Sequence, residues 1–298
     1  NMRCVYCIPR GGVEIKSHEE IMSFEETIRL AKIFASLGIK NIRLTGGEPL
    51  IRKGLLYLVR ALVKTGGIEK VMLTTNGILL PLYAEALKES GLAGINISLD
   101  TLKKDTFKYI TGSDNIDRVF SGIESAKKER LEPIKLNTVI MRGINDSEIP
   151  DFVEFALSKG IVLRFIEFMK VTPLWKKEYY VPIEEIKDTL CKRFRLKKTG
   201  ASNTGPAEYY AIDGESEVGF IKTDETNCRS CNRLRLSSTG DLRICLYEKE
   251  GISLRELVRG GSSDQEIKDI ISYRMSGKSA CDYRTYEPAS SYMCKIGG

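Results

Sequence analysis

Cysteine spacing is the most chemically informative feature of this sequence. Cys4 and Cys7 enclose two residues near the first residue of the chain. A second group, formed by Cys228, Cys231 and Cys245, has gaps of two and thirteen residues. In a reducing compartment such groups are poor disulfide candidates and are first interpreted as ligands of a metal ion or cluster. Three further cysteines have no assigned role: Cys191, Cys281 and Cys294.

Each cysteine group is compatible with more than one chemistry. Two thiolates complete neither a zinc site nor a cluster, and the spacing of Cys4 and Cys7 also occurs in thioredoxin-like redox sites. In the second group, Cys281 or Cys294 could complete a structural zinc site. A 4Fe–4S cluster with three cysteine ligands suits the count better, because it leaves one iron open for a substrate.

Histidine chemistry has almost no basis in this chain. The single histidine, His18, lies in a charged stretch and is expected on the solvated surface, which argues against multi-histidine zinc sites and Ser-His-Asp catalysis.

The 298 residues are 42% hydrophobic and 29% charged, typical of a globular protein, with a formal net charge of +6. This mild excess suits an anionic ligand and does not indicate nucleic-acid binding. No stretch resembles a membrane span or signal peptide, and a cytoplasmic location is predicted.

The first part of the chain alternates helix-like and strand-like segments, which predicts parallel βα units. Gly38, Gly91 and Gly160 lie where helices should end in a left-handed residue. The ligand-binding edge of such a fold is the carboxyl ends of its strands. The predicted helices are residues 23–37, 55–63, 81–89, 102–109, 119–127 and 149–158, and the predicted strands are residues 39–45, 71–74, 95–98, 134–140 and 162–168.

Charged residues occur inside several of these strands. Arg43, Lys135 and Arg164 would each need a partner or a ligand, since both faces of a parallel strand are usually buried. One interpretation pairs them with Glu48 and Glu167 as internal ion pairs. The other, which we favour, is that three cations at one end of a barrel face phosphate groups.

The periodicity weakens after Pro173, so we expect residues 1–171 and 172–298 to form separate domains. Within the second, residues 217–223 are predicted to be β-like and residues 264–272 helical. If the segment after Cys231 is extended, Arg233 and Arg235 project to one side and the intervening Leu234 to the other. Paired guanidinium groups of this kind could bind phosphate, although a solvated strand face would have the same pattern.

Several motifs together resemble a known enzyme family. The run from Asn1 to Cys7 resembles the radical S-adenosylmethionine signature of three cysteines, without its first cysteine, and residues 46–49 (Gly-Gly-Glu-Pro) resemble that superfamily's glycine-rich strand end. The second cysteine group, with residues 232–236, 164–169 and the terminal Gly297-Gly298, resembles the GTP 3′,8-cyclase family. The resemblance runs in consistent order along the whole chain.

The resemblance implies a fold and a reaction. The fold is α/β: an incomplete (βα)6-type, TIM-like barrel without its first strand, followed by a C-terminal auxiliary iron–sulfur domain. The reaction is the first step of molybdenum cofactor biosynthesis, in which a 5′-deoxyadenosyl radical removes hydrogen from C3′ of GTP and that carbon attacks C8 of guanine. Binding must then hold two rings of one substrate within reaction distance.

The resemblance also assigns residues. Cys4 and Cys7 would hold a radical 4Fe–4S cluster, and Cys228, Cys231 and Cys245 an auxiliary one. S-adenosylmethionine would contact Tyr6, Gly46, Gly47, Glu48, Ser98 and Met169. GTP would contact Arg43, Thr74, Lys135, Arg233, Leu234 and Arg235. The tail, Gly297 and Gly298, would reach into the active site.

Further expectations concern partners and the chain start. The resemblance implies an electron donor and the next enzyme of the molybdopterin pathway as partners, and it is compatible with a homodimer. Because the first signature cysteine, a preceding strand and an upstream arginine are absent, we expect the sequence to be truncated at its N-terminus. Two other functions remain open at this point: a zinc-stabilised, non-catalytic nucleotide-binding protein, and a radical enzyme that modifies peptides.

Overall fold

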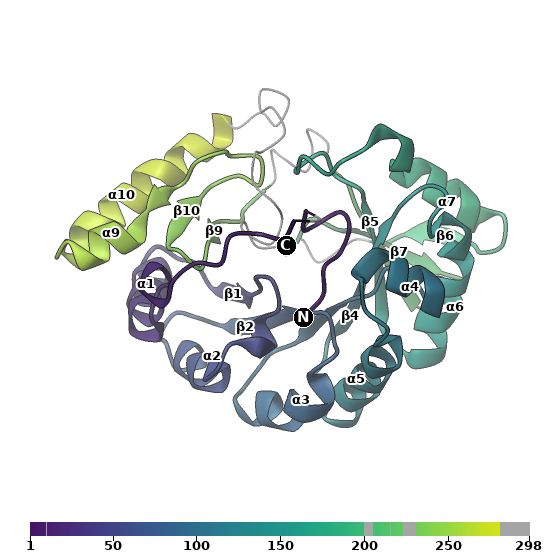
Figure 1. Ribbon diagram of the computed structural model, residues 1–298, viewed down its shortest axis with the longest axis horizontal. Coiled ribbons are helices and arrows are strands. Elements are labelled where there is room, and N and C mark those ends of the chain that lie inside the picture. The colour runs from purple at the N-terminus through teal and green to yellow at the C-terminus, as the bar shows by residue number, and fades with distance from the viewer. Residues whose placement is uncertain (10, 200–204, 215, 223–230, 281–298) are drawn as a thin grey trace.

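The computed structural model describes residues 1–9, 11–199, 205–214, 216–222 and 231–280. Its main body is an eight-stranded sheet whose strands curve around a common centre, with helices on the outside (Figure 1). The strands of this sheet are β1 (Asn41–Leu44), β2 (Lys70–Thr75), β3 (Ile95–Ser98), β4 (Ile134–Ile140), β5 (Val162–Glu167), β6 (Leu196–Lys198), β7 (Glu208–Ile212) and β8 (Ser216–Ile221).

The longer helices are α1 (Phe24–Ser36), α2 (Leu55–Val63), α3 (Leu80–Glu89), α4 (Lys104–Thr111), α5 (Ile116–Lys128), α6 (Ile149–Lys159) and α7 (Ile183–Cys191). The first six of them alternate with strands as the sequence predicts, and α7 was not predicted. Short 3-10 helices are η1 (His18–Glu20), η2 (Pro49–Ile51), η3 (Asp146–Glu148), η4 (Lys177–Tyr179) and η5 (Gly277–Ala280).

The strand order confirms a mostly parallel α/β sheet. The order is β1-β2-β3-β4-β5-β8-β7-β6. Neighbouring strands in the part β1-β2-β3-β4-β5-β8 pair in parallel, whereas β7 pairs antiparallel with both β8 and β6. The β-like region that the sequence assigned to the second domain is β8, which lies beside β5. The sheet therefore continues past residue 171, and the division of the chain at that residue stays a prediction.

The two faces of the sheet differ in chemistry. In β4, residues 134, 136, 138 and 140 are buried, whereas the alternate residues 135, 137 and 139 are partly exposed. The buried set packs under the helices in one large apolar cluster, which includes Leu136 and Ile140. We call the opposite side, which carries Lys135 and Asn137, the inner face.

Local signals explain where the helices begin and end. At the start of α1, the Ser23 hydroxyl accepts from the Glu26 N–H and the Glu26 carboxylate accepts from the Ser23 N–H, so two orphan donors are satisfied. Gly38, Gly91 and Gly160 have φ values of +83°, +86° and +64°, which confirms the predicted left-handed helix ends.

A smaller unit near the C-terminus packs on α1. It contains β9 (Arg235–Leu236), β10 (Asp241–Arg243), β11 (Ile252–Ser253), α9 (Leu254–Arg259) and α10 (Asp264–Ser276). Its apolar contacts with the segment 22–33 involve Met22, Leu30, Ile33, Leu242, Leu254, Ile267 and Ile271. In Figure 1 this unit lies beside α1 and β1, on the other side of the sheet centre from β6 and β7. We call it the C-terminal unit.

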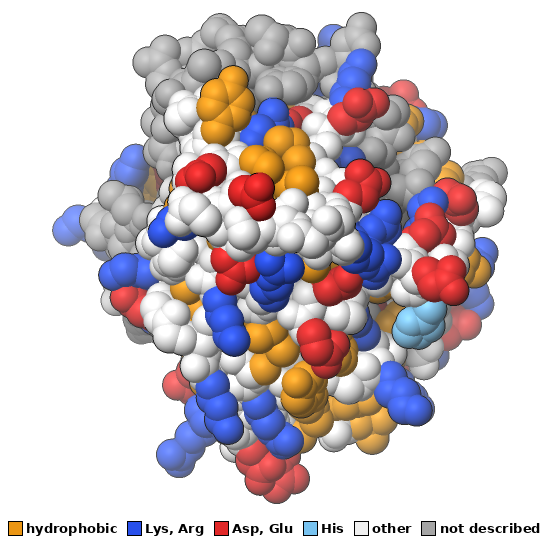
Figure 2. All heavy atoms as spheres, turned by 90° about the vertical axis from the view of Figure 1, so that its left-hand side faces the viewer, with side chains coloured by type: hydrophobic (Ala, Val, Ile, Leu, Met, Phe, Trp, Pro, Cys, Tyr) orange, Lys and Arg blue, Asp and Glu red, His pale blue; other side chains and the backbone are white. Residues whose placement is uncertain are grey.

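The surface agrees with the composition. His18 is exposed, as predicted, and on the face in Figure 2 the acidic and basic side chains are interspersed. Within the described ranges, the helices are all too short or too polar to cross a membrane.

Candidate functional site

A row of polar side chains crosses the inner face on adjacent strands. Strand pairing places Thr74 beside Asn96 and Asn96 beside Lys135. Asn96 Nδ2 donates to Thr74 Oγ1 at 3.3 Å, and Lys135 Nζ donates to Tyr209 Oη at 3.2 Å. The structure thus brings two predicted substrate residues, Thr74 and Lys135, onto one face.

A second row lies one step nearer the carboxyl ends of the strands. It runs from Ser98 through Asn137 and Arg164 to Gly219, which in turn pairs with Tyr209. Arg164 is 6% exposed, and its Nε donates to Asn137 Oδ1 at 2.8 Å. A Cβ at Gly219 would lie 2.8 Å from Arg164 Cγ, so glycine lets this side chain lie against β8.

The guanidinium groups of the inner face oppose one another electrostatically. Burial, followed by the charges of Arg164 and Arg233, lowers the pKa of Arg43 to about 10 against the opposing effect of Tyr209. Burial likewise lowers the pKa of Arg164. A ligand with several anionic oxygens would relieve both effects, because opposite charge favours the ionised guanidinium.

The ion pairs considered from the sequence are not formed. Arg43 donates to Met72 Sδ at 3.5 Å, and the contacts of Lys135 and Arg164 are to neutral groups. Among the described residues, none of these three cations pairs with a carboxylate. Glu48 and Glu167 point to other donors, so the anion-facing interpretation is the one that the geometry supports.

The C-terminal unit contributes a second pair of arginines. Burial lowers the pKa of Arg235 to about 10, with a further effect of Arg233, which places these two charges near each other. Leu234 and Leu236 pack against the apolar cluster of the unit, so the predicted alternation of this segment is confirmed. The charge of Arg233 also lowers the pKa of Arg43, so the pair formed by Arg233 and Arg235 lies close to the inner face.

Two cysteines of the second group lie beside these arginines. The Cys231 and Cys245 thiols both raise the pKa of Arg235, so both are near its guanidinium. The pKa of Cys231 is below its usual value. Burial raises this pKa, but the N–H group and charge of Arg233, together with the ammonium of Lys278, lower it by more. This environment favours a thiolate, the form that binds metal. Cys228 lies outside the described residues.

The first cysteine pair lies in a turn anchored to α4. The N–H groups of Cys7 and Ile8 both donate to Cys4 O, at 2.9 and 3.0 Å. Outside the turn, Arg3 N–H and Val5 N–H donate to the carbonyls of Thr111 and Ile110 at 2.8 and 2.9 Å. We call residues 3–8 the cysteine loop. Its backbone is set by the end of α4 and not by a neighbouring strand.

Tyr6 connects the cysteine loop to the ends of β3 and β4. Its hydroxyl donates to Asp100 Oδ2 at 2.6 Å, and Asp100 Oδ1 accepts from Val139 N–H at 2.8 Å. Burial raises the pKa of Asp100 to about 6, against the opposing effect of these two hydrogen bonds. Asn145, fully buried, donates to both Asp100 O and Val139 O and so joins the two strand ends.

The thiol of Cys4 differs from that of Cys231. Burial, followed by the negative charge of Asp100, raises the pKa of Cys4 to about 12. A thiol in such a place is protonated at neutral pH unless a cation replaces the proton. Cluster binding at the cysteine loop would therefore release a proton from Cys4.

The Gly-Gly-Glu-Pro motif forms the turn after β1. Gly46 has φ +144°, a conformation that other residues rarely adopt, and Gly47 is exposed. The buried Glu48 carboxylate accepts from Leu50 N–H at 3.0 Å, Thr75 Oγ1 at 2.7 Å and Asn76 N–H at 2.8 Å. Glu48 thus joins this turn to the end of β2, because its carboxylate accepts hydrogen bonds from both segments.

The other residues assigned to S-adenosylmethionine meet at the same edge of the sheet. Ser98 is the last residue of β3, and Met169 follows β5 by two residues. Between them lies Tyr6, whose ring is 6.2 Å from that of Phe168. This edge is formed by the carboxyl ends of parallel strands, where ligands of such folds bind. The Gly297-Gly298 tail lies outside the described residues.

The described cysteines offer incomplete donor sets for clusters. Cys4 with Cys7 and Cys231 with Cys245 supply thiol ligands of the type that iron–sulfur clusters use, while Cys191 is exposed at the end of α7. Within the described part of the chain, no group of three or more candidate metal ligands is found. The residues present fit thiolate ligation at two places, the cysteine loop and the C-terminal unit.

Comparisons with known proteins settle the family. Residues 1–156 match the family model described as Radical SAM superfamily, and residues 161–282 match Molybdenum Cofactor Synthesis C. The GTP 3′,8-cyclase of Moorella thermoacetica is 45% identical over 94% of this chain and 88% of that protein. The chain belongs to the GTP 3′,8-cyclase family. The resemblance seen in the sequence is thereby confirmed.

Other comparisons agree with membership of the GTP 3′,8-cyclase family. The GTP 3′,8-cyclase of Syntrophomonas wolfei is 42% identical over 100% of this chain and 94% of that protein. Among solved structures, native anSMEcpe with bound AdoMet has a TM-score of 0.61 at 17% identity, covering 89% of this chain and 78% of that one. At this identity the structural likeness concerns the fold alone, and it supports the radical SAM α/β architecture.

Sequence reasoning missed several residues of this family member's site. Tyr209 lies in β7, far along the chain from Lys135, and no local signal connects the two. Gly219 has an ordinary strand context in the sequence, and its role depends on Arg164 lying across it. Tyr6 was assigned from the sequence, but no local signal connects it to Asp100, which accepts its hydrogen bond.

Proposed function

We propose that this chain is a radical S-adenosylmethionine enzyme that converts GTP to (8S)-3′,8-cyclo-7,8-dihydroguanosine 5′-triphosphate, the first step of molybdenum cofactor biosynthesis. The observation that carries the proposal is the match of both family models, in order, together with relatives named GTP 3′,8-cyclase that the chain covers almost completely. The inner face supports it independently, because it gathers Arg43, Lys135 and the buried Arg164, none of which has a carboxylate partner among the described residues.

The cofactor end of the site would be formed at the carboxyl edge of the sheet. Cys4 and Cys7 would ligate the radical 4Fe–4S cluster, and Ser98 and Met169 would lie near S-adenosylmethionine. When bound, this pair supplies the radical that removes hydrogen from the substrate. The chain's part is to position them: the N–H groups on Cys4 O hold the turn, and Tyr6 ties it to Asp100.

The substrate end would be the inner face and the arginines of the C-terminal unit. We propose that Arg43, Thr74 and Lys135 bind GTP from the sheet, and that Arg233, Leu234 and Arg235 do so from the other side. Arg164 belongs with them on geometric grounds, since it is buried and its charge has no counter-ion among the residues that the structure describes. Several guanidinium groups suit a triphosphate because each can bind two oxygens.

The auxiliary cluster is a further part of this proposal. Cys228, Cys231 and Cys245 would be its ligands, and a cluster with three protein ligands would keep one iron available to bind the substrate. The lowered pKa of Cys231 supports thiolate ligation at this place. The Gly297-Gly298 tail would reach the same region. A cytoplasmic location, an external electron donor, the next molybdopterin enzyme as a partner and a homodimer complete the proposal.

The test is turnover by the protein expressed from its complete reading frame. Purified without oxygen and loaded with iron and sulfide, it should convert GTP to the cyclic product, detected by mass, when S-adenosylmethionine and reductant are added. A preparation shown to contain two reduced clusters that makes no product would contradict the proposal. Metal analysis separates the zinc alternative, which requires about one zinc and no iron per chain.

A further inference from the structure

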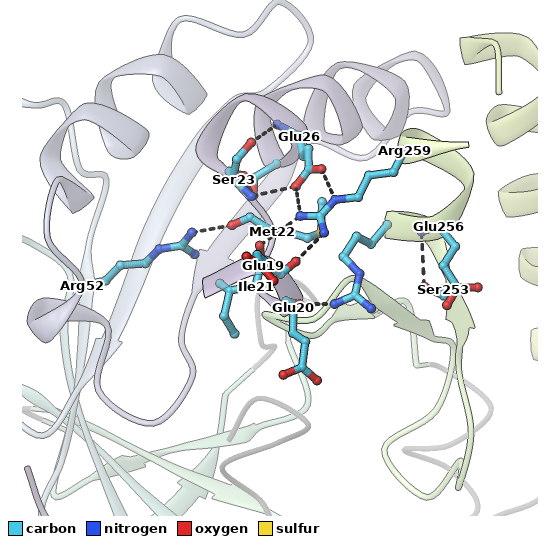
Figure 3. Close-up of polar contacts among 12 residues, drawn as sticks. Glu19, Glu20, Ile21, Met22, Ser23, Glu26, Arg52, Ser253, Glu256 and Arg259 are labelled. Atoms are coloured by element: carbon cyan, nitrogen blue, oxygen red, sulfur yellow. Dashed lines mark hydrogen bonds and ion pairs between the residues drawn. The ribbon is translucent and has the colours of Figure 1, made fainter. Parts of the chain in front are cut away.

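Three arginines bind four consecutive carbonyl groups between the cysteine loop and α1. Arg259 donates to Glu19 O and, at 3.2 Å, to Ile21 O, while Arg255 donates to Glu20 O. Arg52, which follows η2, donates to Met22 O at 2.6 Å. Figure 3 shows Arg259 and Arg52 approaching this segment from opposite sides. We call these contacts the arginine clamp.

The clamp is anchored at the start of α1. Arg259 Nε lies 2.6 Å from Glu26 Oε1, and its Nη2 lies 3.1 Å from Glu26 Oε2. The same carboxylate accepts the Ser23 N–H at 2.7 Å, so Glu26 both caps α1 and orients Arg259 (Figure 3). The Arg259 hydrogen bond is the main cause of the lowered pKa of Glu26. One guanidinium thus bridges a helix start and the backbone leading into it.

The clamp arginines Arg255 and Arg259 come from α9, which is continuous with the cysteine-bearing sheet of the C-terminal unit. Leu254 N–H donates to Gly240 O at 2.8 Å, so α9 begins against the turn between β9 and β10. A Cβ at Gly240 would lie 2.5 Å from Arg255 Cβ, which makes glycine necessary for this close approach. β9 carries Arg235, and Cys245 follows β10 by two residues. Any movement of α9 therefore moves the arginines and the cysteines of the C-terminal unit.

The clamped segment also has contacts that do not involve these guanidinium groups, since Glu20 N–H donates to Ser17 O at 3.1 Å and the Glu20 carboxylate accepts from Ser17 N–H at 2.9 Å. Residues 19–22 form no strand pairing, although Met22 N–H donates to Ser238 O at 2.9 Å and the Met22 side chain is buried in the α1 contact. Without the guanidinium groups, the carbonyls of Glu19 to Ile21 would bind water, and the backbone leading into α1 would lose its hydrogen bonds to α9.

We infer that Arg255 and Arg259 are positioning residues that hold the C-terminal unit, with its arginines and cysteines, against the start of α1 and so against the sheet. The consequence for GTP rests on the proposed function, in which GTP spans the inner face and the Arg233–Arg235 pair. S-adenosylmethionine is proposed to bind at the sheet edge alone. Loss of the clamp should therefore weaken the binding of GTP and not that of S-adenosylmethionine.

The experiment compares Arg255→Met, Arg259→Met and the double variant with the parent enzyme loaded with iron and sulfide. We expect KM for GTP to rise about tenfold in the double variant, because a misplacement of about 1 Å can reduce rates by up to about a hundredfold. KM for S-adenosylmethionine should stay within about twofold. A matched control is Arg193→Met, which removes an exposed arginine pair with Glu154 on the outer helices and should change neither constant.

A second readout needs no turnover. In the protein without substrates, hydrogen exchange at the amides of residues 17–22 and 231–245 should accelerate in the clamp variants and not in Arg193→Met. If the double variant fails to fold, Arg259→Lys replaces it, since an ammonium cannot reach all the acceptors of the guanidinium. Partial effects in that variant support the same conclusion.

Two outcomes would overturn the inference. One is faster exchange at residues 17–22 with an unchanged KM for GTP, which would show that the clamp serves stability alone. The other is unchanged exchange in both segments. If the parent itself neither binds nor converts GTP, the proposed function fails, and the exchange at residues 231–245 still decides whether the clamp positions the C-terminal unit.

Discussion

Replacing Asp100 by asparagine is expected to remove a specific pH dependence from the stability of this protein. Asp100 is 7% exposed, and its two oxygens accept from Tyr6 Oη and Val139 N–H. Asparagine keeps the shape and can satisfy both partners, because its oxygen accepts from Val139 and its NH2 group donates to the phenolic oxygen. The variant therefore changes the ionisation at this site and little else.

The magnitude follows from the pKa of the buried carboxyl group. Burial raises the pKa of Asp100 from 3.8 to about 6, so the folded state holds this proton more tightly than the unfolded chain. Stability contributed by the protonated form is fully present below pH 3.8 and is lost as the pH rises through about 6. The full loss is about 3 kcal/mol, of which about 1.5 kcal/mol falls between pH 5 and pH 8.

The assay is urea unfolding of the metal-free, reduced protein between pH 5 and pH 8. The free energy of unfolding of Asp100→Asn, relative to the parent, should increase by about 1.5 kcal/mol across this range. Asp188→Asn, at an exposed position on α7, is the matched control and should follow the parent. A constant difference between Asp100→Asn and the parent would refute the reasoning, since it would mean that Asp100 titrates alike in both states.

Three other substitutions test separate parts of the site. Gly219→Ala should destabilise the protein by about 1 to 3 kcal/mol, because its Cβ would meet Arg164 Cγ at 2.8 Å, and an unchanged denaturation midpoint would count against this contact. Lys135→Met should weaken GTP binding, measured by calorimetry, by roughly ten- to a hundredfold, as expected for a lost charged hydrogen bond, while Tyr209→Phe should have a smaller effect. Glu48→Ala should lower the free energy of unfolding by at least about 3 kcal/mol, since three donors lose their acceptor, and Glu48→Gln should recover part of this loss.

Local patterns in the sequence were sufficient for the βα elements of the first part of the chain, although not for α7, β6 or β7. The alternation of helix and strand, the capping residue Ser23 and the glycines at helix ends depend on neighbours within a few residues, and the structure confirms them. The same holds for the polar alternation in β4, where Lys135 and Asn137 share the inner face. Motif order along the chain was likewise enough to indicate the GTP 3′,8-cyclase family.

The sequence could not predict contacts between distant segments. The placement of β8 beside β5, and the continuation of the sheet past residue 171, depend on which strand edge is available when the chain returns. The approach of Tyr209 to Lys135 follows from that placement. Competing ion pairs for Arg43 and Arg164 were equally consistent with residue types, and only distances could decide between them.

What the sequence determined by itself is therefore the list of chemical groups and the secondary structure that carries them. What the tertiary structure decided is their mutual charge environment: a buried Arg164 with a neutral partner, a Cys4 thiol that holds its proton, a Cys231 thiol that loses it more readily, and the arginine clamp between α9 and the backbone leading into α1. The physical reason is that burial and electrostatic coupling depend on separation in space, whereas helix caps, turns and strand alternation depend on separation along the chain.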